Sequence, residues 1–122
     1  MQKTLTFLFV VQGEGRGHMT QAIAMHDMLV KNNYAVCCVL VGKNKQREIP
    51  AFVIKNLKCE VASFESPNFA TDSKMKSVKI LRSVSKNLMR VGTFKRSISF
   101  IHSKVREYNP NVIINFYDPL IS

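Results

Sequence analysis

The sequence contains no apolar run long enough to cross a bilayer, which takes about 20 residues in a helix. The most apolar stretch near the start, residues 5–11, is short and is interrupted by Thr6. It leads into a glycine-rich turn and not into a small-residue cleavage site, so it is neither a membrane span nor a signal peptide. We therefore expect any contact with a membrane to be peripheral.

Cysteine is scarce, with three residues at Cys37, Cys38 and Cys59 and no Cys-x-x-Cys pair. An odd number at this spacing argues against a disulfide framework or a zinc site and indicates a reducing, cytoplasmic compartment. No two of the three histidines have metal-ligand spacing with a third partner, so no metal is predicted. Cys37 and Cys38 are expected to point to opposite faces of a strand and to pack.

Acidic residues are absent from residues 74–106, which hold ten of the 18 lysines and arginines. The other eight basic residues balance the eight acidic ones, so this segment carries the whole net charge of +10. A partner chosen by charge should therefore meet the protein there. A solvated helix face is the plain interpretation, an anionic membrane the second and nucleic acid the least favoured.

With 122 residues the chain has room for one domain. Apolar, β-branched runs predict buried strands over residues 4–11, 34–41, 59–64 and 111–116. Helical spacing predicts helices from the glycine turn to Asn32, over 47–57 with Pro50 in the first turn, and over 80–108, kinked or broken near Gly92. Residues 65–73 carry turn residues and form the longest predicted loop. The alternation predicts a Rossmann-like, doubly wound parallel sheet in three α/β/α layers, with strand order 3-2-1-4.

This strand order makes the first and fourth strands neighbours at the switch point, where such sheets bind ligands. His18 and Asp118 follow those two strands, so we expect them to lie close together. The fourth strand is apolar on both faces, yet only residues 117–122 follow it. The sequence therefore predicts a fragment of a longer protein.

The turn after the first strand reads Gly13-Glu14-Gly15-Arg16-Gly17-His18 and opens a helix. Glycines permit positive φ and close backbone approach, and free N–H groups at a helix start attract anions such as phosphate. A dinucleotide fingerprint needs Gly-x-Gly-x-x-Gly and an acidic residue about 20 positions later, whereas the second strand here ends without one. NAD is disfavoured, and an NADP-binding oxidoreductase fragment, using Lys43 or Lys45, stays open.

His18 at a helix N-terminus feels the positive end of the helix dipole, which favours neutral imidazole. A neutral imidazole takes a proton from a hydroxyl, and a carboxylate such as Asp118 would orient it. The plainer interpretation makes His18 a helix residue bonded to a loop carbonyl and Asp118 a turn former before Pro119. His26 lies on the apolar stripe of the same helix, where a packed, hydrogen-bonded histidine is favoured over a ligand.

The stretch GEGRGHMTQAIAM after an apolar first strand resembles the opening of GT-B fold glycosyltransferases, in particular a bacterial branch whose glycine-rich loop ends in Gly-His. UDP-glycosyltransferases and the peptidoglycan N-acetylglucosaminyltransferase are more distant relatives. The resemblance implies two Rossmann-like domains, the first for the acceptor and the second for the nucleotide-sugar. Residues 1–122 would form the first, acceptor-side domain, with the donor-binding domain absent. This chain alone should therefore not catalyse transfer.

Within the resemblance, Gly13, Gly15 and Gly17 match the loop that faces the acceptor or the donor phosphates. His18 matches the base of the plant-type enzymes, and Asp118 falls where those enzymes place the paired carboxylate. The implied reaction is inverting transfer from a nucleotide-sugar, with UDP-sugar the expected donor and no other cofactor.

The same stretch contributes Glu14, Arg16 and Met19 as candidate binding residues. Glu14 would bind a sugar hydroxyl or stay solvated, since a carboxylate facing phosphate is unfavourable. Met19 lies beside the site, although packing is the plainer role for it. Gln21 stands where many relatives have proline, which leaves the subfamily open.

The expected acceptor is a hydroxyl, either lipid-linked or on a glycan. A lipid-linked acceptor would fit peripheral contact between residues 74–106 and the inner face of an anionic membrane. A non-enzymatic basic module is the remaining alternative, and it predicts binding that weakens steeply with salt.

Overall fold

The computed structural model describes residues 4–13, 16–44, 48–66 and 91–116. Its strands are β1 (Thr6–Gln12), β2 (Ala35–Lys43), β3 (Glu60–Glu65) and β4 (Val112–Phe116), and its helices are α1 (Arg16–Lys31), α2 (Ala51–Asn56) and α4 (Val91–Tyr108). Each strand lies within two residues of its predicted bounds. The turn and loop that were predicted over residues 65–73 fall outside the described residues after position 66.

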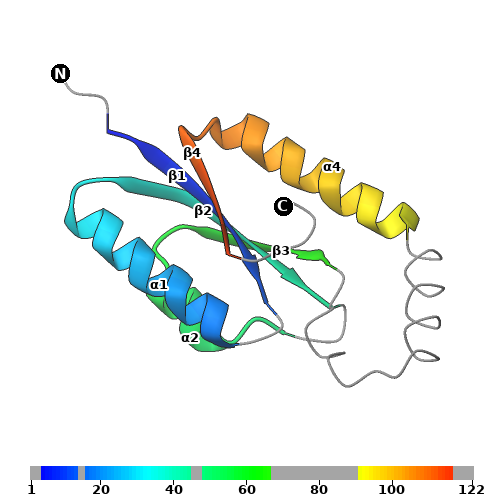
Figure 1. Cartoon of the computed structure of the whole chain (residues 1–122), viewed down its shortest axis with the longest axis horizontal. Helices are drawn as coiled ribbons and strands as arrows, with labels where there is room; N and C mark the ends of the chain where they lie inside the picture. Colours follow the sequence, from blue (N-terminus) through cyan, green and yellow to red (C-terminus); the bar gives the residue numbers. More distant parts are fainter. Residues whose placement is uncertain (1–3, 14–15, 45–47, 67–90, 117–122) are drawn as a thin grey trace.

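The four strands form one parallel sheet in the order β3-β2-β1-β4 (Figure 1). β1 is central, and its side chains alternate between two cores: Phe9 and Val11 face α1 and α2, while Leu8 and Val10 face α4. All four side chains are buried, which explains why β1 is apolar without interruption from Phe7 to Val11. The Rossmann-like three-layer architecture and the strand order are both confirmed.

The prediction of a helix over residues 47–57 is wrong about its start. α2 covers only Ala51–Asn56, and Pro50 stands before it with φ −57° and ψ 142°. The proline ring disfavours helical geometry in the residue before it, so the helix begins only after Pro50. Val53 is fully buried and anchors this short helix to the core.

The prediction for residues 80–108 is tested only in its second half. α4 begins at Val91, so Gly92 is its second residue, and residues 80–90 lie outside the described part of the chain. The helix ends at Tyr108, followed by Asn109 with φ 45°, whose N–H bonds the carbonyl of Val105 at 2.8 Å. This left-handed asparagine is a helix stop, as the Asn-Pro pair predicted.

The prediction that Cys37 and Cys38 face opposite sides of β2 is wrong. The β1–β2 register runs from Phe7↔Val36 to Leu8↔Cys38, which leaves Cys37 as an extra, bulged residue. The bulge resets the alternation of the strand, so both cysteines pack on the α4 side of the sheet. The Cys37 thiol uses this position to donate to the Phe7 carbonyl at 3.3 Å.

The apolar side chains of α1 are buried at Met19, Ala22 and Leu29 but not at Val30, which is 44% exposed. His26 is 2% exposed, its Nδ1 lies 3.0 Å from an Asp27 oxygen, and its Nε2 accepts from a backbone N–H of the segment after α2 at 3.4 Å. The prediction of a packed, hydrogen-bonded histidine at position 26 is therefore confirmed.

Candidate functional site at the carboxyl edge of the sheet

The carboxyl ends of all four parallel strands meet at one edge of the sheet, and the glycine-rich loop leaves β1 at that edge (Figure 1). Gly13 opens the loop, and its N–H donates to the Gly42 carbonyl of β2 at 2.6 Å. A Cβ at position 13 would lie 2.6 Å from Cγ1 of Val41 and 2.9 Å from the Gly42 oxygen. Glycine is therefore required here for close approach, one of the two roles the sequence predicted.

The other predicted role of the glycines, positive φ, is not used by any glycine among the described residues. Gly17 is exposed, and a Cβ on it would meet nothing within 4 Å. Glu14 and Gly15 lie outside the described residues, and of Arg16 only the backbone, as the first residue of α1, is described. Of the loop that was predicted to bind anions, the structure thus describes Gly13 and the start of α1.

His18 is the third residue of α1 and lies half-buried behind the loop. Its Nδ1 atom is shielded from solvent. A proton that the ring exchanges with solvent or a ligand would therefore pass through Nε2. Met19 is 3% exposed and packs in the core between α1 and the sheet, where it anchors the first turn of the helix. Asp118 lies outside the described residues.

The fourth strand brings its end to the same place. Val11 of β1 pairs with Phe116 of β4, and the two strands run parallel, so residue 116 lies beside the exit to the glycine loop. The Phe116 ring packs edge-on against Phe9, with ring centroids 5.2 Å apart, which fixes the end of β4 to the core. The adjacency of the first and fourth strands, on which the predicted site depends, is confirmed.

Gln12 is a residue of this edge that the sequence analysis missed. It ends β1, pairs with Gly42 and is only 6% exposed, although it is polar. A polar residue closing an otherwise apolar run was the available signal. Its burial places an amide beside Gly13 at the base of the loop.

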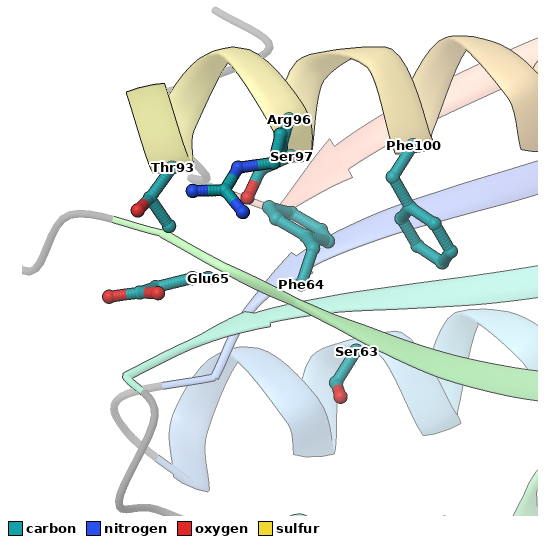
Figure 2. A pocket seen from close by; sticks show the side chains of 7 residues that line it. All are labelled: Ser63, Phe64, Glu65, Thr93, Arg96, Ser97 and Phe100. Carbon is teal, nitrogen blue, oxygen red and sulfur yellow. The ribbon is translucent and has the colours of Figure 1, made fainter. Parts of the chain in front are cut away.

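A second missed feature is a pocket of about 320 Å³ between β3 and α4 at the carboxyl end of β3 (Figure 2). Phe64 rises from β3 toward Arg96 and Ser97 of α4, and Glu65 lies at the end of the strand. The lining combines charged, hydroxyl and aromatic side chains, namely Ser63, Phe64, Glu65, Thr93, Arg96, Ser97 and Phe100. No local pattern in the chain indicates this pocket, because its two walls are about 30 residues apart.

An apolar pocket of about 390 Å³ lies on the other face, between α1 and the end of β4. It is lined by Gln21, Ala24, Met25, Met28 and Phe116. Met28 is 51% exposed, and Ile113 on β4 is 44% exposed. Ile113 pairs with Leu8 and so lies on the α4 face, opposite the pocket. Apolar surface is therefore exposed on both faces of the sheet around β4, and its cover by further chain stays a prediction.

The charged cluster at the opposite, amino edge of the sheet is structural. Lys104 of α4 bonds Glu60 at 2.7 Å and Glu107 at 3.2 Å, and the Tyr108 hydroxyl donates to Glu60. The hydrogen bonds from Lys104 and Tyr108 lower the pKa of Glu60. In turn, the bond to Glu60 raises the pKa of Lys104, and it raises the pKa of Tyr108 to about 12. These contacts tie α4 to the start of β3 and hold the helix over the sheet.

The cysteines have no nucleophilic character. Burial raises the pKa of Cys38 to about 12 and that of Cys59 to about 11, and it also raises the pKa of Cys37. Each thiol is therefore protonated at neutral pH. Among the described residues, no three His, Cys, Asp or Glu side chains gather in a group that could hold a metal ion.

No helix in the described part of the chain is both long and apolar enough to cross a membrane. The fold and the strand order are those of a Rossmann-like domain, a class of sheet that binds ligands at its switch point. The model of Glycosyl transferase family 1 matches residues 5–122. The chain belongs to this family, so it is a glycosyltransferase-class protein, as the resemblance of the glycine-rich stretch implied.

Comparison with curated proteins found no match, and comparison with solved structures found none either. The family model covers β1 through β4, and so includes both the glycine loop and the strand that ends beside it. Membership gives no support to the alternative of an NADP-binding oxidoreductase fragment. Family membership assigns no role to an individual site residue.

Proposed function

We propose that this chain forms the acceptor-side domain of a glycosyltransferase that moves a sugar from a nucleotide-sugar, expected to be a UDP-sugar, to an acceptor hydroxyl. The observation that carries the proposal is the position of His18 in the first turn of α1, directly behind the glycine loop. The pairing of β1 with β4 at this edge supports it, because ligands of doubly wound sheets bind at such a point. Family membership supports sugar transfer as the reaction.

In the proposed reaction, the imidazole of His18 accepts the proton of the acceptor hydroxyl as its oxygen attacks the anomeric carbon. The new C–O bond forms on one face while the bond to the nucleoside diphosphate breaks on the other, so the configuration inverts. The diphosphate leaves with the electron pair. N–H groups at the start of α1 face this edge and would stabilise the charge that develops on it.

Asp118 is the proposed partner that orients the His18 ring and stabilises imidazolium. The chain reaches it two residues after Phe116, whose backbone lies beside the end of β1. A carboxylate in this place would hold the ring in one tautomer, as in other base–carboxylate pairs. The proposal does not require a metal, because proton transfer and charge stabilisation are assigned to the chain.

The remaining expectations also stand as proposals. The donor would be bound by a second domain, and residues 74–106 would touch the inner face of a membrane if the acceptor is lipid-linked. Of the basic residues in that segment, Lys95, Arg96, Lys104 and Arg106 are described on α4, and all but Lys104 are exposed. Exposure is required for contact with an anionic surface, and it is equally expected of a solvated helix face.

The experiment compares His18→Ala and His18→Gln with His102→Ala in the whole gene product, assaying nucleotide release from a panel of UDP-sugars with acceptors. His102 is exposed on α4, away from the glycine loop, and is the matched control. Loss of a general base lowers kcat by about 100-fold or more. Unchanged kcat in both His18 variants, with an active His102→Ala enzyme, would show that His18 is not the base.

A further inference from the structure

We propose that the pocket between β3 and α4 is a sugar-binding subsite that holds a neutral saccharide unit of the acceptor. Binding of sugar to the pocket follows from the pocket itself, and its assignment to the acceptor rests on the proposed function. The pocket measures about 320 Å³, at the lower end of the range of small-molecule sites, about 300–1,000 Å³. It therefore suits a ligand no larger than a few rings.

Arg96 supplies hydrogen-bond donors to this pocket. Its Nε donates to the Gly92 carbonyl of the preceding turn at 3.4 Å, which points the guanidinium along α4 toward Thr93 (Figure 2). Within the described part of the chain, Arg96 makes no ion pair. An arginine presents five N–H donors, so its terminal nitrogens are available for a ligand in the pocket.

The described lining of the pocket carries charges of both signs, which selects among ligands. Glu65 brings one negative charge to the end of β3, while Arg96 brings one positive charge from α4. An anion attracted by Arg96 would be repelled by Glu65, and a cation would meet the reverse. A neutral ligand with many hydroxyls gains from both, since a hydroxyl donates to carboxylate and accepts from guanidinium.

Hydroxyl and aromatic side chains complete the match to a sugar. Thr93 and Ser97 line the α4 wall, and each hydroxyl donates and accepts as a sugar hydroxyl requires. The Phe64 and Phe100 rings lie between helix and sheet in the same pocket. Phe64 is buried and forms the apolar base, whereas the half-buried Phe100 offers an apolar face to the C–H surface of a sugar ring. Phe100 is fixed from behind by Lys104, whose ammonium lies 5.9 Å from the ring centroid.

The place of the pocket relative to the glycine loop indicates what kind of acceptor fits. Both lie at the carboxyl edge of the sheet, and β3 is two strands from β1. At about 4.8 Å per strand, the two strands are roughly 10 Å apart. The pocket lies on the α4 face of the sheet and His18 on α1 at the other face, so the ligand must also cross the edge of the sheet. A chain of linked sugars spans that distance, so one unit occupies the pocket while the hydroxyl of another reaches His18.

The test titrates the full chain, labelled with ¹⁵N, with glucose, N-acetylglucosamine, maltose, cellobiose and N,N′-diacetylchitobiose, and separately with inorganic phosphate. We expect at least one sugar to shift the amide signals of Thr93, Arg96 and Ser97. Arg96→Ala should lower the affinity for that sugar about tenfold or more, because the substitution removes charge-assisted hydrogen bonds. Arg106→Ala, a control at the other end of α4, should leave the affinity unchanged.

Three results would overturn the inference: no sugar shifts these signals, the shift survives Arg96→Ala, or only inorganic phosphate produces it. Arg96 and Arg106 are both exposed, so neither variant should unfold the chain, and Glu65→Gln provides a second test on the β3 wall. In Glu65→Gln the sugar affinity should also fall, while any affinity for phosphate should rise. A rise in affinity for both sugar and phosphate would contradict the proposed selectivity for a neutral ligand.

Kinetics in the active enzyme separate this inference from the proposed function. Arg96→Ala should raise the acceptor KM with little change in kcat, whereas His18→Ala should lower kcat. If His18→Ala abolishes transfer and Arg96→Ala leaves the acceptor KM unchanged, the subsite fails and the function stands. If sugars bind the pocket but transfer is insensitive to His18→Ala, the proposed role of His18 fails and the subsite stands.

Discussion

Gly13 lies so close to Val41 that a Cβ atom at position 13 would come within 2.6 Å of the valine Cγ1. The contact joins the start of the glycine loop to the buried end of β2, where Val41 is 1% exposed and has no room to move. Gly13 also donates its N–H to the carbonyl of Gly42. Loop position and core packing are therefore coupled at this one residue.

Gly13→Ala should consequently destabilise the protein by about 1–3 kcal/mol, the usual range for overpacking. The matched control is Gly92→Ala, since a Cβ on Gly92 meets nothing within 4 Å and the residue is helical. That control should leave the free energy of unfolding unchanged or slightly raised. Urea denaturation measures both, and equal stability of the two variants would contradict the close approach.

Phe116→Ala tests whether β4 is fixed to the sheet as described. The ring is 8% exposed and packs against Phe9, so its loss should lower stability by about 3–5 kcal/mol. Ile113→Ala on the same strand is the control, because Ile113 is 44% exposed and should change stability much less. Denaturant midpoints at constant m-value report the difference, and a small loss in Phe116→Ala would argue against the β1–β4 pairing.

The bond between Lys104 and Glu60 should make thermal stability depend on pH at both extremes. The folded pKa of Glu60 is lowered below its ordinary 4.5, so its stabilising contribution is present above that pH and is lost as pH falls through the folded pKa. The pKa of Lys104 is raised above 10.5, so its contribution is present below that pH and is lost as pH rises through the folded value.

Glu60→Gln should therefore lower the melting temperature by a few degrees between pH 6 and 8, and the difference from wild type should shrink below pH 4.5. Glu107→Gln is the control, because Glu107 is more exposed and contacts Lys104 at the longer distance of 3.2 Å. Its effect should be smaller at every pH. A Glu60→Gln difference that stays constant into acid would show that the carboxylate charge does not contribute.

The thiols should react slowly with alkylating agents while the chain is folded. Burial holds the pKa of Cys38 near 12, and this residue is 0% exposed, so little thiolate forms and little reagent reaches it. At pH 8 we expect alkylation in native buffer to be about 100-fold slower than in urea, with Cys38 the slowest. Mass spectrometry after timed quenching measures each site, and rapid labelling of Cys38 without denaturant would contradict its burial.

Much of the fold is set by local pattern. The apolar run of β1 from Phe7 to Val11 predicted burial on both faces, and Phe9 and Leu8 alternate between the two cores in the structure. Asn33, with φ 67°, ends α1 where the asparagine pair predicted a stop. The glycine-rich loop after β1 pointed to the switch point and to the family, since strand, turn and helix follow one another directly in the chain.

Other features depend on contacts that no local pattern contains. The bulge at Cys37 comes from the register between β1 and β2 and turns both cysteines to one side. The start of α2 was misplaced because Pro50 proved to precede the helix and not to lie within its first turn. The bond between Glu60 and Lys104 likewise joins residues 44 positions apart.

The sequence by itself thus determined the strands, the strand order, the glycine loop and the identity of His18 as a candidate base, because each follows from neighbours along the chain or from the usual topology of such sheets. Only the tertiary structure decided which side chains share a pocket. Phe64 and Arg96 meet because α4 crosses over β3, held by Lys104 and Tyr108 at the other edge. Contacts between residues so far apart in the chain depend on how the elements pack, and hydrophobic periodicity along the sequence does not predict them.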